Sequence, residues 1–370
     1  MKKVALITLH RVTNFGSLLQ TYATQTALTR LSCEVEVIDY VPRGLTFREA
    51  VFPGHHGSLP KKLVKLLPLL AVNAVQFRMT NRFLKKHIAL SKRRYSSYGE
   101  LLAAPPAADI YMSGSDQIWN TQNNNAPDDI MAYYLCFAPK GAPRLAYAGS
   151  FGKTELTPEE QATVGDWLST YRTISVREDT ALTLLESVGI RNGVHVVDPT
   201  LLLSAKEWLA FCGKKPPRSG YVFVYNLNRN RLAKELARRL AEEKGLRIVN
   251  FSDSLDFIGG ARNRFGNTPQ DFLNFLAHAD YVVTDSFHGT AFSLNLEKQV
   301  FCVPAPRYNS RLESLLRKLS LLNTRLVHTV EEGLSAMETE IDYSTVTPQL
   351  EAFREASWSF LTEALSYDDE

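Results

Sequence analysis

The chain has 370 residues, and 45% of them are hydrophobic, which supplies enough apolar surface for two hydrophobic cores. Its net charge of +3 is too small to predict nucleic-acid binding, and its 4 cysteines show no paired spacing for a zinc ion or a redox dithiol. No segment approaches the roughly 20 apolar residues of a membrane span. Met1 leads directly into a strand-like run without a cleavage site, so we expect a cytoplasmic protein.

The small net charge is an average over two parts of opposite sign. Residues 1–100 hold 16 basic and 5 acidic residues, whereas the remaining residues hold 26 and 34. Within 61–94 there are ten bases and no acid, interleaved with leucine and phenylalanine. This pattern predicts a basic helical insertion, interrupted at Pro68. A solvated helical face is the favoured interpretation, and peripheral contact with the anionic inner face of a membrane is the alternative.

Apolar runs of strand length alternate with segments of helix length, which predicts an α/β fold with parallel sheets. Ten such runs are too many for one compact doubly wound unit, so we expect two domains, over 1–168 and 169–330. The final segment, 331–370, has eleven acids and one base, and we expect it to form a helix that packs back on the basic first domain. The strand-like runs are 4–9, 35–40, 110–113, 145–149, 173–176, 194–197, 221–225, 247–251, 281–284 and 300–303.

Ligands of open parallel sheets bind beyond the carboxyl ends of the strands, where this chain carries several polar clusters. Residues 14–17, Asn-Phe-Gly-Ser, lead into a helix whose free N–H groups are suited to an anion or a sugar oxygen, although a glycine before a helix is common. Residues 113–120, Ser-Gly-Ser-Asp-Gln-Ile-Trp-Asn, offer hydrogen bonds for a carbohydrate beside an aromatic ring. The alternative is a capped helix start with Trp119 in the core. Residues 147–152 either line the cleft or form a turn.

Two further strand ends carry chemistry suited to an anionic ligand. Arg177 follows the strand at 173–176, where its guanidinium suits a phosphate or a carboxylate, or else pairs with the neighbouring acids. His288 stands at the start of a helix in Asp-Ser-Phe-His-Gly-Thr, where a protonated imidazole needs a carboxylate such as Asp285 or a bound substrate. This environment favours proton donation to an anion, whereas a structural histidine is the other interpretation. No histidine has the spacing of a metal ligand, so we predict no metal site.

Six motifs occur in a fixed order: Gly-Ser-Leu-Leu-Gln, Gly-Ser-Asp-Gln-Ile-Trp-Asn, Tyr-Ala-Gly-Ser-Phe-Gly, Ser-Val-Arg-Glu, Val-Asp-Pro-Thr-Leu-Leu-Leu and Asp-Ser-Phe-His-Gly-Thr. Together they resemble the polysaccharide pyruvyl transferase family over roughly residues 4–330. The resemblance implies two Rossmann-like domains facing a cleft, as in GT-B glycosyltransferases. It also implies phosphoenolpyruvate as co-substrate, without a cofactor, and formation of a pyruvate ketal on a sugar.

By this resemblance, His288 is the catalytic acid and Arg177 holds the anionic donor, with Ser286, Phe287 and Gly289 beside them. Many relatives have a second arginine two residues before the histidine, where this chain has Ser286. We therefore expect Arg311 to supply the missing cation; Arg307, Arg262 and Arg264 are the alternatives. The residues expected on the acceptor side are Asn14, Gly16, Ser17, Gln20, Ser115, Asp116 and Asn120.

The acceptor that the resemblance implies is a lipid-linked or nucleotide-linked saccharide of a capsule or exopolysaccharide. A polyprenyl-diphosphate acceptor would give the basic run 61–94 a use at the inner membrane surface. Two other functions stay open. One is a GT-B nucleotide-sugar glycosyltransferase, although no nucleotide-binding fingerprint supports it. The other is a non-catalytic saccharide-binding homologue.

Overall fold

The computed structural model describes residues 1–41, 63–121, 128–252, 256–306 and 309–366, with the side chains of 63–69 left aside. Its first sheet has seven strands in the order β3-β2-β1-β4-β5-β6-β7, and every pair of neighbours is parallel. These strands are β1 (Lys3–Ile7), β2 (Glu34–Tyr40), β3 (Leu90–Tyr95), β4 (Ile110–Ser113), β5 (Arg144–Gly149), β6 (Thr173–Val176) and β7 (Val194–His195).

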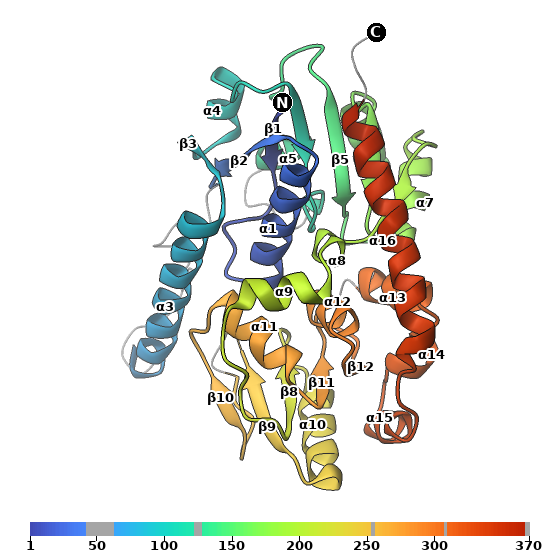
Figure 1. Cartoon of the computed structure of the whole chain (residues 1–370). Coiled ribbons are helices and arrows are strands. Elements are labelled where there is room, and N and C mark those ends of the chain that lie inside the picture. Colours follow the sequence, from blue (N-terminus) through green and yellow to red (C-terminus); the bar gives the residue numbers. More distant parts are fainter. Residues whose placement is uncertain (42–62, 122–127, 253–255, 307–308, 367–370) are drawn as a thin grey trace.

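The second sheet has five strands in the order β10-β9-β8-β11-β12, again all parallel. Its strands are β8 (Tyr221–Tyr225), β9 (Arg247–Phe251), β10 (Arg262–Arg264), β11 (Tyr281–Thr284) and β12 (Gln299–Cys302). Figure 1 shows this sheet below the first one, with helices packed on both. The prediction of two Rossmann-like α/β domains is therefore confirmed.

Helices lie between most successive strands, as the crossovers of a parallel sheet require, and the last four described helices follow the final strand. The described helices are α1 (Phe15–Arg30), α3 (Leu63–His87), α4 (Tyr98–Ala103), α5 (Asp129–Tyr133), α6 (Pro158–Leu168), α7 (Asp179–Ser187), α8 (Pro199–Leu202), α9 (Ala205–Cys212), α10 (Arg231–Lys244), α11 (Pro269–Ala277), α12 (Phe287–Asn295), α13 (Ser310–Lys318), α14 (Leu322–Arg325), α15 (Val330–Met337) and α16 (Tyr343–Ser366). None of the helices in the described segments has the length and apolar character needed to cross a bilayer.

The structure differs from the sequence expectation at the junction between the domains. Strand β6 pairs with β5, through Leu145 with Thr173 and Ala146 with Ile174, and β7 pairs with β6. The first sheet thus continues beyond residue 168, and Arg177 follows a strand of the first sheet. The order of strands in a sheet depends on tertiary pairing, which the chain order of apolar runs does not reveal.

The basic run 61–94 also differs from a purely helical insertion. Helix α3 continues through Pro68, and residues 90–94 belong to the edge strand β3. Pro68 is the sixth residue of α3, beyond the first turn, so the helix lacks one N–H hydrogen bond there and still continues. The segment is therefore one long helix followed by a strand.

A shared core joins the two domains. Phe15 at the start of α1 stacks on Phe272 of α11 with ring centroids 5.3 Å apart, and Trp208 of α9 packs edge-on against Phe292 of α12 at 5.1 Å. These rings belong to one buried cluster that contains residues of both sheets. Burial of a large aromatic side chain stabilises a fold by about 2 kcal/mol, so this cluster holds the domains in one arrangement.

Helix α16 runs along both domains (Figure 1). Near its start, Tyr343 donates a hydrogen bond to the carbonyl oxygen of Lys298 in the second domain. Near its end, Ser357 Oγ accepts from the backbone N–H of Val197 at 2.9 Å, and Lys2 Nζ donates to Leu365 O at 3.0 Å. The acidic C-terminal segment thus makes hydrogen bonds to both domains.

Candidate active site

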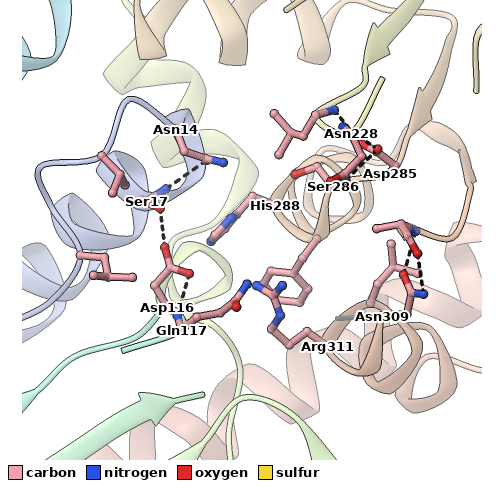
Figure 2. A pocket seen from close by; sticks show the side chains of 16 residues that line it. Asn14, Ser17, Asp116, Gln117, Asn228, Asp285, Ser286, His288, Asn309 and Arg311 are labelled. Carbon is pink, nitrogen blue, oxygen red and sulfur yellow. Dashed lines mark hydrogen bonds between the residues drawn. The ribbon is translucent and has the colours of Figure 1, made fainter. Parts of the chain in front are cut away.

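A cavity of about 310 Å³ lies between the domains, at the carboxyl ends of the strands of both sheets. Open parallel sheets place their ligands there, because the helix N-termini point into this space. Figure 2 shows the first-domain residues on one side, the second-domain residues on the other, and His288 between them. The lining residues are Leu9, Val12, Asn14, Ser17, Asp116, Gln117, Leu227, Asn228, Asp285, Ser286, Phe287, His288, Ala305, Asn309, Arg311 and Leu312.

The wall on the first-domain side is held by local hydrogen bonds. Asn14 is the N-cap of α1, and its Oδ1 accepts from the backbone N–H of Gly16 at 2.8 Å. Ser17 Oγ donates to Asp116 Oδ2, while the backbone N–H of Gln117 donates to Asp116 Oδ1 at 2.8 Å. Asp116 has a φ of +78°, an unfavourable conformation for a side chain other than glycine, and such strain is concentrated at functional sites.

His288 lies in the first turn of α12, directly after the carboxyl end of β11. Ser286 caps this helix by accepting from the N–H of Gly289 at 3.2 Å. The imidazole is 4% exposed and packs against the N-terminus of α1, where a Cβ on Gly16 would lie 2.1 Å from its Nδ1. Only a glycine at position 16 permits this contact, so Gly16 of the first domain allows His288 of the second domain to pack here.

The carboxylate nearest to His288 is Asp198, at the N-cap of α8. Its Oδ2 lies 3.8 Å from His288 Nε2, an ion-pair distance too long for a hydrogen bond, and that nitrogen has no hydrogen-bond partner among the described residues. Asp198 Oδ1 accepts from the N–H and the hydroxyl of Thr200. Burial alone would raise the pKa of Asp198, but the nearby His288 and Arg177 hold it well below its usual range.

Arg177 lies beneath the cavity and not on its surface. Its side chain is fully buried, with Nη1 2.8 Å from Asp198 Oδ2 and Nη2 3.1 Å from Asp116 Oδ1. Burial lowers the pKa of this guanidinium, but the carboxylates around it, Asp116 and Asp198 first, more than offset that effect, and the pKa is raised overall. Burial raises the pKa of the adjacent Glu178 despite the charge of Arg177. Arg177 therefore connects Asp116 of the first-domain wall to Asp198, the carboxylate that faces His288.

Arg311 lies on the cavity itself, in the first turn of α13. With the Gln117 amide assigned so that its oxygen faces the guanidinium, that oxygen lies 3.1 Å and 2.6 Å from Arg311 Nη1 and Nη2. The Phe287 ring has Arg177 Cζ 4.9 Å and Arg311 Cζ 5.9 Å from its centroid. Burial and the charge of Arg177 lower the pKa of Arg311 to about 10, so the guanidinium would gain stability from an added anion.

Asp285, the carboxylate expected beside His288, forms hydrogen bonds to the loop after β8 instead. It accepts from the backbone N–H groups of Leu227 and Asn228 at 2.7 Å and 2.9 Å, and its burial raises its pKa. Asp285 therefore anchors the loop after β8, while Asp198 faces the imidazole. Asp198 belongs to the Val-Asp-Pro-Thr motif, but its proximity to His288 depends on contact between the domains, which the sequence alone does not show.

The structure brings most of the expected site residues to one place. Asn14, Ser17, Asp116, Ser286, Phe287, His288 and Arg311 line the cavity. Gly16, Gln20, Ser115, Asn120, Arg177 and Gly289 lie behind that surface: Gln20 donates to Thr8, and Ser115 donates to Asp198 at 3.0 Å. Arg262 and Arg264 form β10 away from the cavity, and Arg307 lies outside the described residues. The polar lining residues that were not among the expected site residues are Gln117, Asn228 and Asn309; Gln117 lies within the polar cluster 113–120.

Over the described segments, no three side chains of His, Cys, Asp or Glu gather as a set for a metal ion. The fold and the cavity define the class: a two-domain α/β protein of the GT-B architecture with its site between the domains. The model of one sequence family, Polysaccharide pyruvyl transferase, matches residues 14–305. The chain belongs to the polysaccharide pyruvyl transferase family. No functionally curated protein matches the sequence significantly.

Solved structures with the same architecture include one in complex with UDP and two UDP-N-acetylglucosamine 2-epimerases. S. aureus MnaA in complex with UDP has a TM-score of 0.53 and 12% identity, with 95% of this chain and 91% of that chain covered. The UDP-N-acetylglucosamine 2-epimerase of Rickettsia bellii has a TM-score of 0.52 and 13% identity, with 99% and 97% covered. The Methanocaldococcus jannaschii UDP-GlcNAc 2-epimerase in complex with UDP-GlcNAc and UDP has a TM-score of 0.51 and 14% identity, with 92% and 93% covered. At these identities the similarity establishes the fold alone.

Proposed function

We propose that this protein transfers the enolpyruvyl group of phosphoenolpyruvate to two hydroxyls of a saccharide and closes a pyruvate ketal. The observation that carries the proposal is the pairing of His288 and Arg311 on one small interdomain cavity of about 310 Å³. The first can donate a proton, and the second is a cation suited to a carboxylate or a phosphate. Membership of the pyruvyl transferase family supports the same chemistry.

In this proposal Arg311 and the N-terminus of α12 hold the anionic groups of the donor. Arg177 acts indirectly, since its guanidinium is occupied by Asp116 and Asp198. Its role is to keep both carboxylates ionised and in place. Asp198 Oδ2 then faces His288 Nε2 from 3.8 Å and holds a negative charge beside the imidazole.

The reaction follows from these positions. His288 gives a proton to C3 of the donor, so the methylene becomes a methyl group and C2 becomes electrophilic. One sugar hydroxyl adds to C2 and loses its proton, which restores the charge of His288. The C2–O bond to phosphate breaks, and a second hydroxyl adds to C2 while its proton leaves with the phosphate. The products are the ketal and inorganic phosphate.

The acceptor sugar would lie against the first-domain wall. Ser17 and Asp116 share a hydrogen bond there, and Asn14 and Gln117 add polar groups that suit hydroxyls. We propose that the saccharide is carried on a lipid or a nucleotide and serves a cell-surface polysaccharide. Phosphoenolpyruvate is a cytoplasmic metabolite, so the reaction would take place on the inner side of the membrane.

The test is to incubate the protein with phosphoenolpyruvate and a panel of galactose- and mannose-bearing acceptors and to follow phosphate release by phosphorus NMR. We expect turnover with at least one acceptor, its loss in His288→Ala, and full activity in His328→Ala, which removes an exposed histidine. Transfer from a nucleotide sugar in place of phosphoenolpyruvate would establish a glycosyltransferase. Saccharide binding without any transfer would establish a non-catalytic homologue. Activity that survives in His288→Ala would refute the assigned acid.

A further inference from the structure

The exposed face of α3 has no part in the proposed reaction. Within residues 70–87, the side chains on the opposite face, such as Phe83 and Leu84, are buried against the first domain. At about 100° per residue, the exposed side chains fall within an arc of about 100°, so they form one stripe along the helix. We call it the α3 stripe; its members are Ala71, Val75, Arg78, Arg82, Lys85 and Lys86.

The α3 stripe carries charge of one sign. No acidic residue occurs between 63 and 87 in the sequence, and none of the four bases in the stripe has an ion-pair partner within the described part of the chain. A helix that is merely solvated usually mixes both signs, as α10 does, where Arg238 pairs with Glu235 and Arg239 with Glu243. The uncompensated charge of the stripe therefore indicates an anionic partner.

A groove of about 580 Å³ adjoins the stripe, between α3, α9 and α11. Two stripe residues, Arg82 and Lys86, lie on its rim, and Lys214 on the far side is already paired with Asp271. The other walls are largely apolar and aromatic. The groove thus offers cations beside an apolar lining, which suits a phosphate headgroup with the first carbons of a lipid chain. Its lining residues are Met79, Arg82, Phe83, Lys86, His87, Phe211, Cys212, Gly213, Lys214, Thr268, Pro269 and Gln270.

The end of the stripe nearer the start of α3 is apolar and continues onto the second domain. Val75 is 43% exposed and lies against Gly266, where a Cβ would come within 2.7 Å of its Cγ1. Next to Gly266, Phe265 packs edge-on against Phe257 with ring centroids 5.1 Å apart, and Phe257 is 57% exposed. Exposed aromatic and aliphatic side chains beside a basic helix are typical of surfaces that enter a headgroup boundary.

We propose that the α3 stripe and the groove beside it dock this protein onto an anionic phospholipid surface. Arg78, Arg82, Lys85 and Lys86 would bind lipid phosphates, while Val75 and Phe257 would enter the headgroup region. This proposal rests on the proposed function in one respect: docking would give the enzyme access to an acceptor carried on a lipid. Figure 1 shows α3 on the outer flank of the molecule, where a surface can approach it.

The first test measures co-flotation of the full chain with vesicles of phosphatidylcholine alone and of phosphatidylcholine containing phosphatidylglycerol. We expect binding to the anionic vesicles only, lost on addition of salt. A lysine or arginine near such a surface strengthens binding about fivefold, so R78Q/R82Q/K85Q/K86Q should bind nearly three orders of magnitude more weakly, by about 600-fold. The control K140Q/R231Q/R239Q/K244Q removes as many exposed bases from other elements and should bind as the wild type does.

The second test separates docking from catalysis. The stripe variant should release phosphate at the wild-type rate with a water-soluble acceptor, since none of its changes lies on the interdomain cavity. V75S/F257S should bind the anionic vesicles about tenfold more weakly. Equal vesicle binding by the wild type and the stripe variant would overturn the proposal, as would failure of the wild type to bind. Self-association that disappears in the stripe variant without vesicle binding would assign the surface to a second copy of the chain.

Discussion

Asp198→Asn tests the electrostatic arrangement around His288 most directly. The substitution keeps the size of the side chain and an oxygen for the N–H of Thr200, but it removes the negative charge 3.8 Å from His288 Nε2. Asp198 Oδ2 also accepts from Arg177 Nη1 at 2.8 Å, so the exchange leaves a buried guanidinium without one of its two hydrogen-bonded carboxylates. Removing one partner of a buried ion pair costs about 3–5 kcal/mol of stability. A small displacement of a catalytic group lowers the rate by about 100-fold, so we expect a fall in kcat of that order when His288 loses the carboxylate that faces it.

The assay is phosphate release from phosphoenolpyruvate at neutral pH, with melting temperature measured alongside. D198N should lower kcat with little change in donor KM, because Arg311, which would bind the donor, is unaltered. Thr200→Val serves as the matched control: it removes the 2.7 Å hydrogen bond to the other oxygen, Oδ1, and leaves the charge. That variant should lose stability while its kcat stays within threefold of the wild type. A D198N enzyme within threefold of wild-type kcat would refute the assignment of Asp198.

Three further changes test the rest of the site and the fold. Gly16→Ala would place a Cβ 2.1 Å from His288 Nδ1 and should lower kcat at least tenfold with little change in donor KM. The control Gly99→Ala, whose Cβ would have its nearest neighbour at 3.9 Å, should be neutral. Equal kinetics of the two variants would contradict the packing of His288 against Gly16. Burial and a neighbouring arginine lower the pKa of Arg311 to about 10, so donor KM should rise as the pH rises through about 10, and Arg311→Gln should raise KM about a hundredfold and abolish that rise. Burial would raise the pKa of Asp39, but hydrogen bonds from a histidine and two arginines hold this pKa well below its usual range. Asp39→Asn should therefore lower the free energy of unfolding in urea by about 3 kcal/mol at neutral pH. The difference from the wild type should shrink as the pH falls below about 4, because protonation of Asp39 then removes the stability that its carboxylate contributes.

The fold class and the position of His288 at a strand end could be predicted because both are encoded locally. Apolar runs of strand length alternate with helices, and the polar turn at His288 directly follows one of those runs. The partner of His288 could not be predicted in this way. Asp198 and Asp285 both follow apolar runs, and only the packing of α8 against α12 places Asp198 near the imidazole. The same limit applies to β6 and β7, whose sheet is decided by pairing with β5.

The helix cap at Ser286 and the position of Arg311 form one arrangement. At position 286 the side chain caps α12, with Ser286 Oγ accepting from Gly289 N. A helix cap of this kind stabilises a helix by about 1 kcal/mol, and a cation placed on α13 leaves the cap of α12 intact. The position of Arg311 on α13 also depends on how the two domains pack together. Helix α13 contacts α7 of the first domain through a 2.9 Å hydrogen bond from the N–H of Asp179 to Ser314 Oγ. The charge that would bind the donor and the wall that would bind the acceptor are then set by one interdomain contact, so a change that loosens the contact should weaken binding of both substrates together.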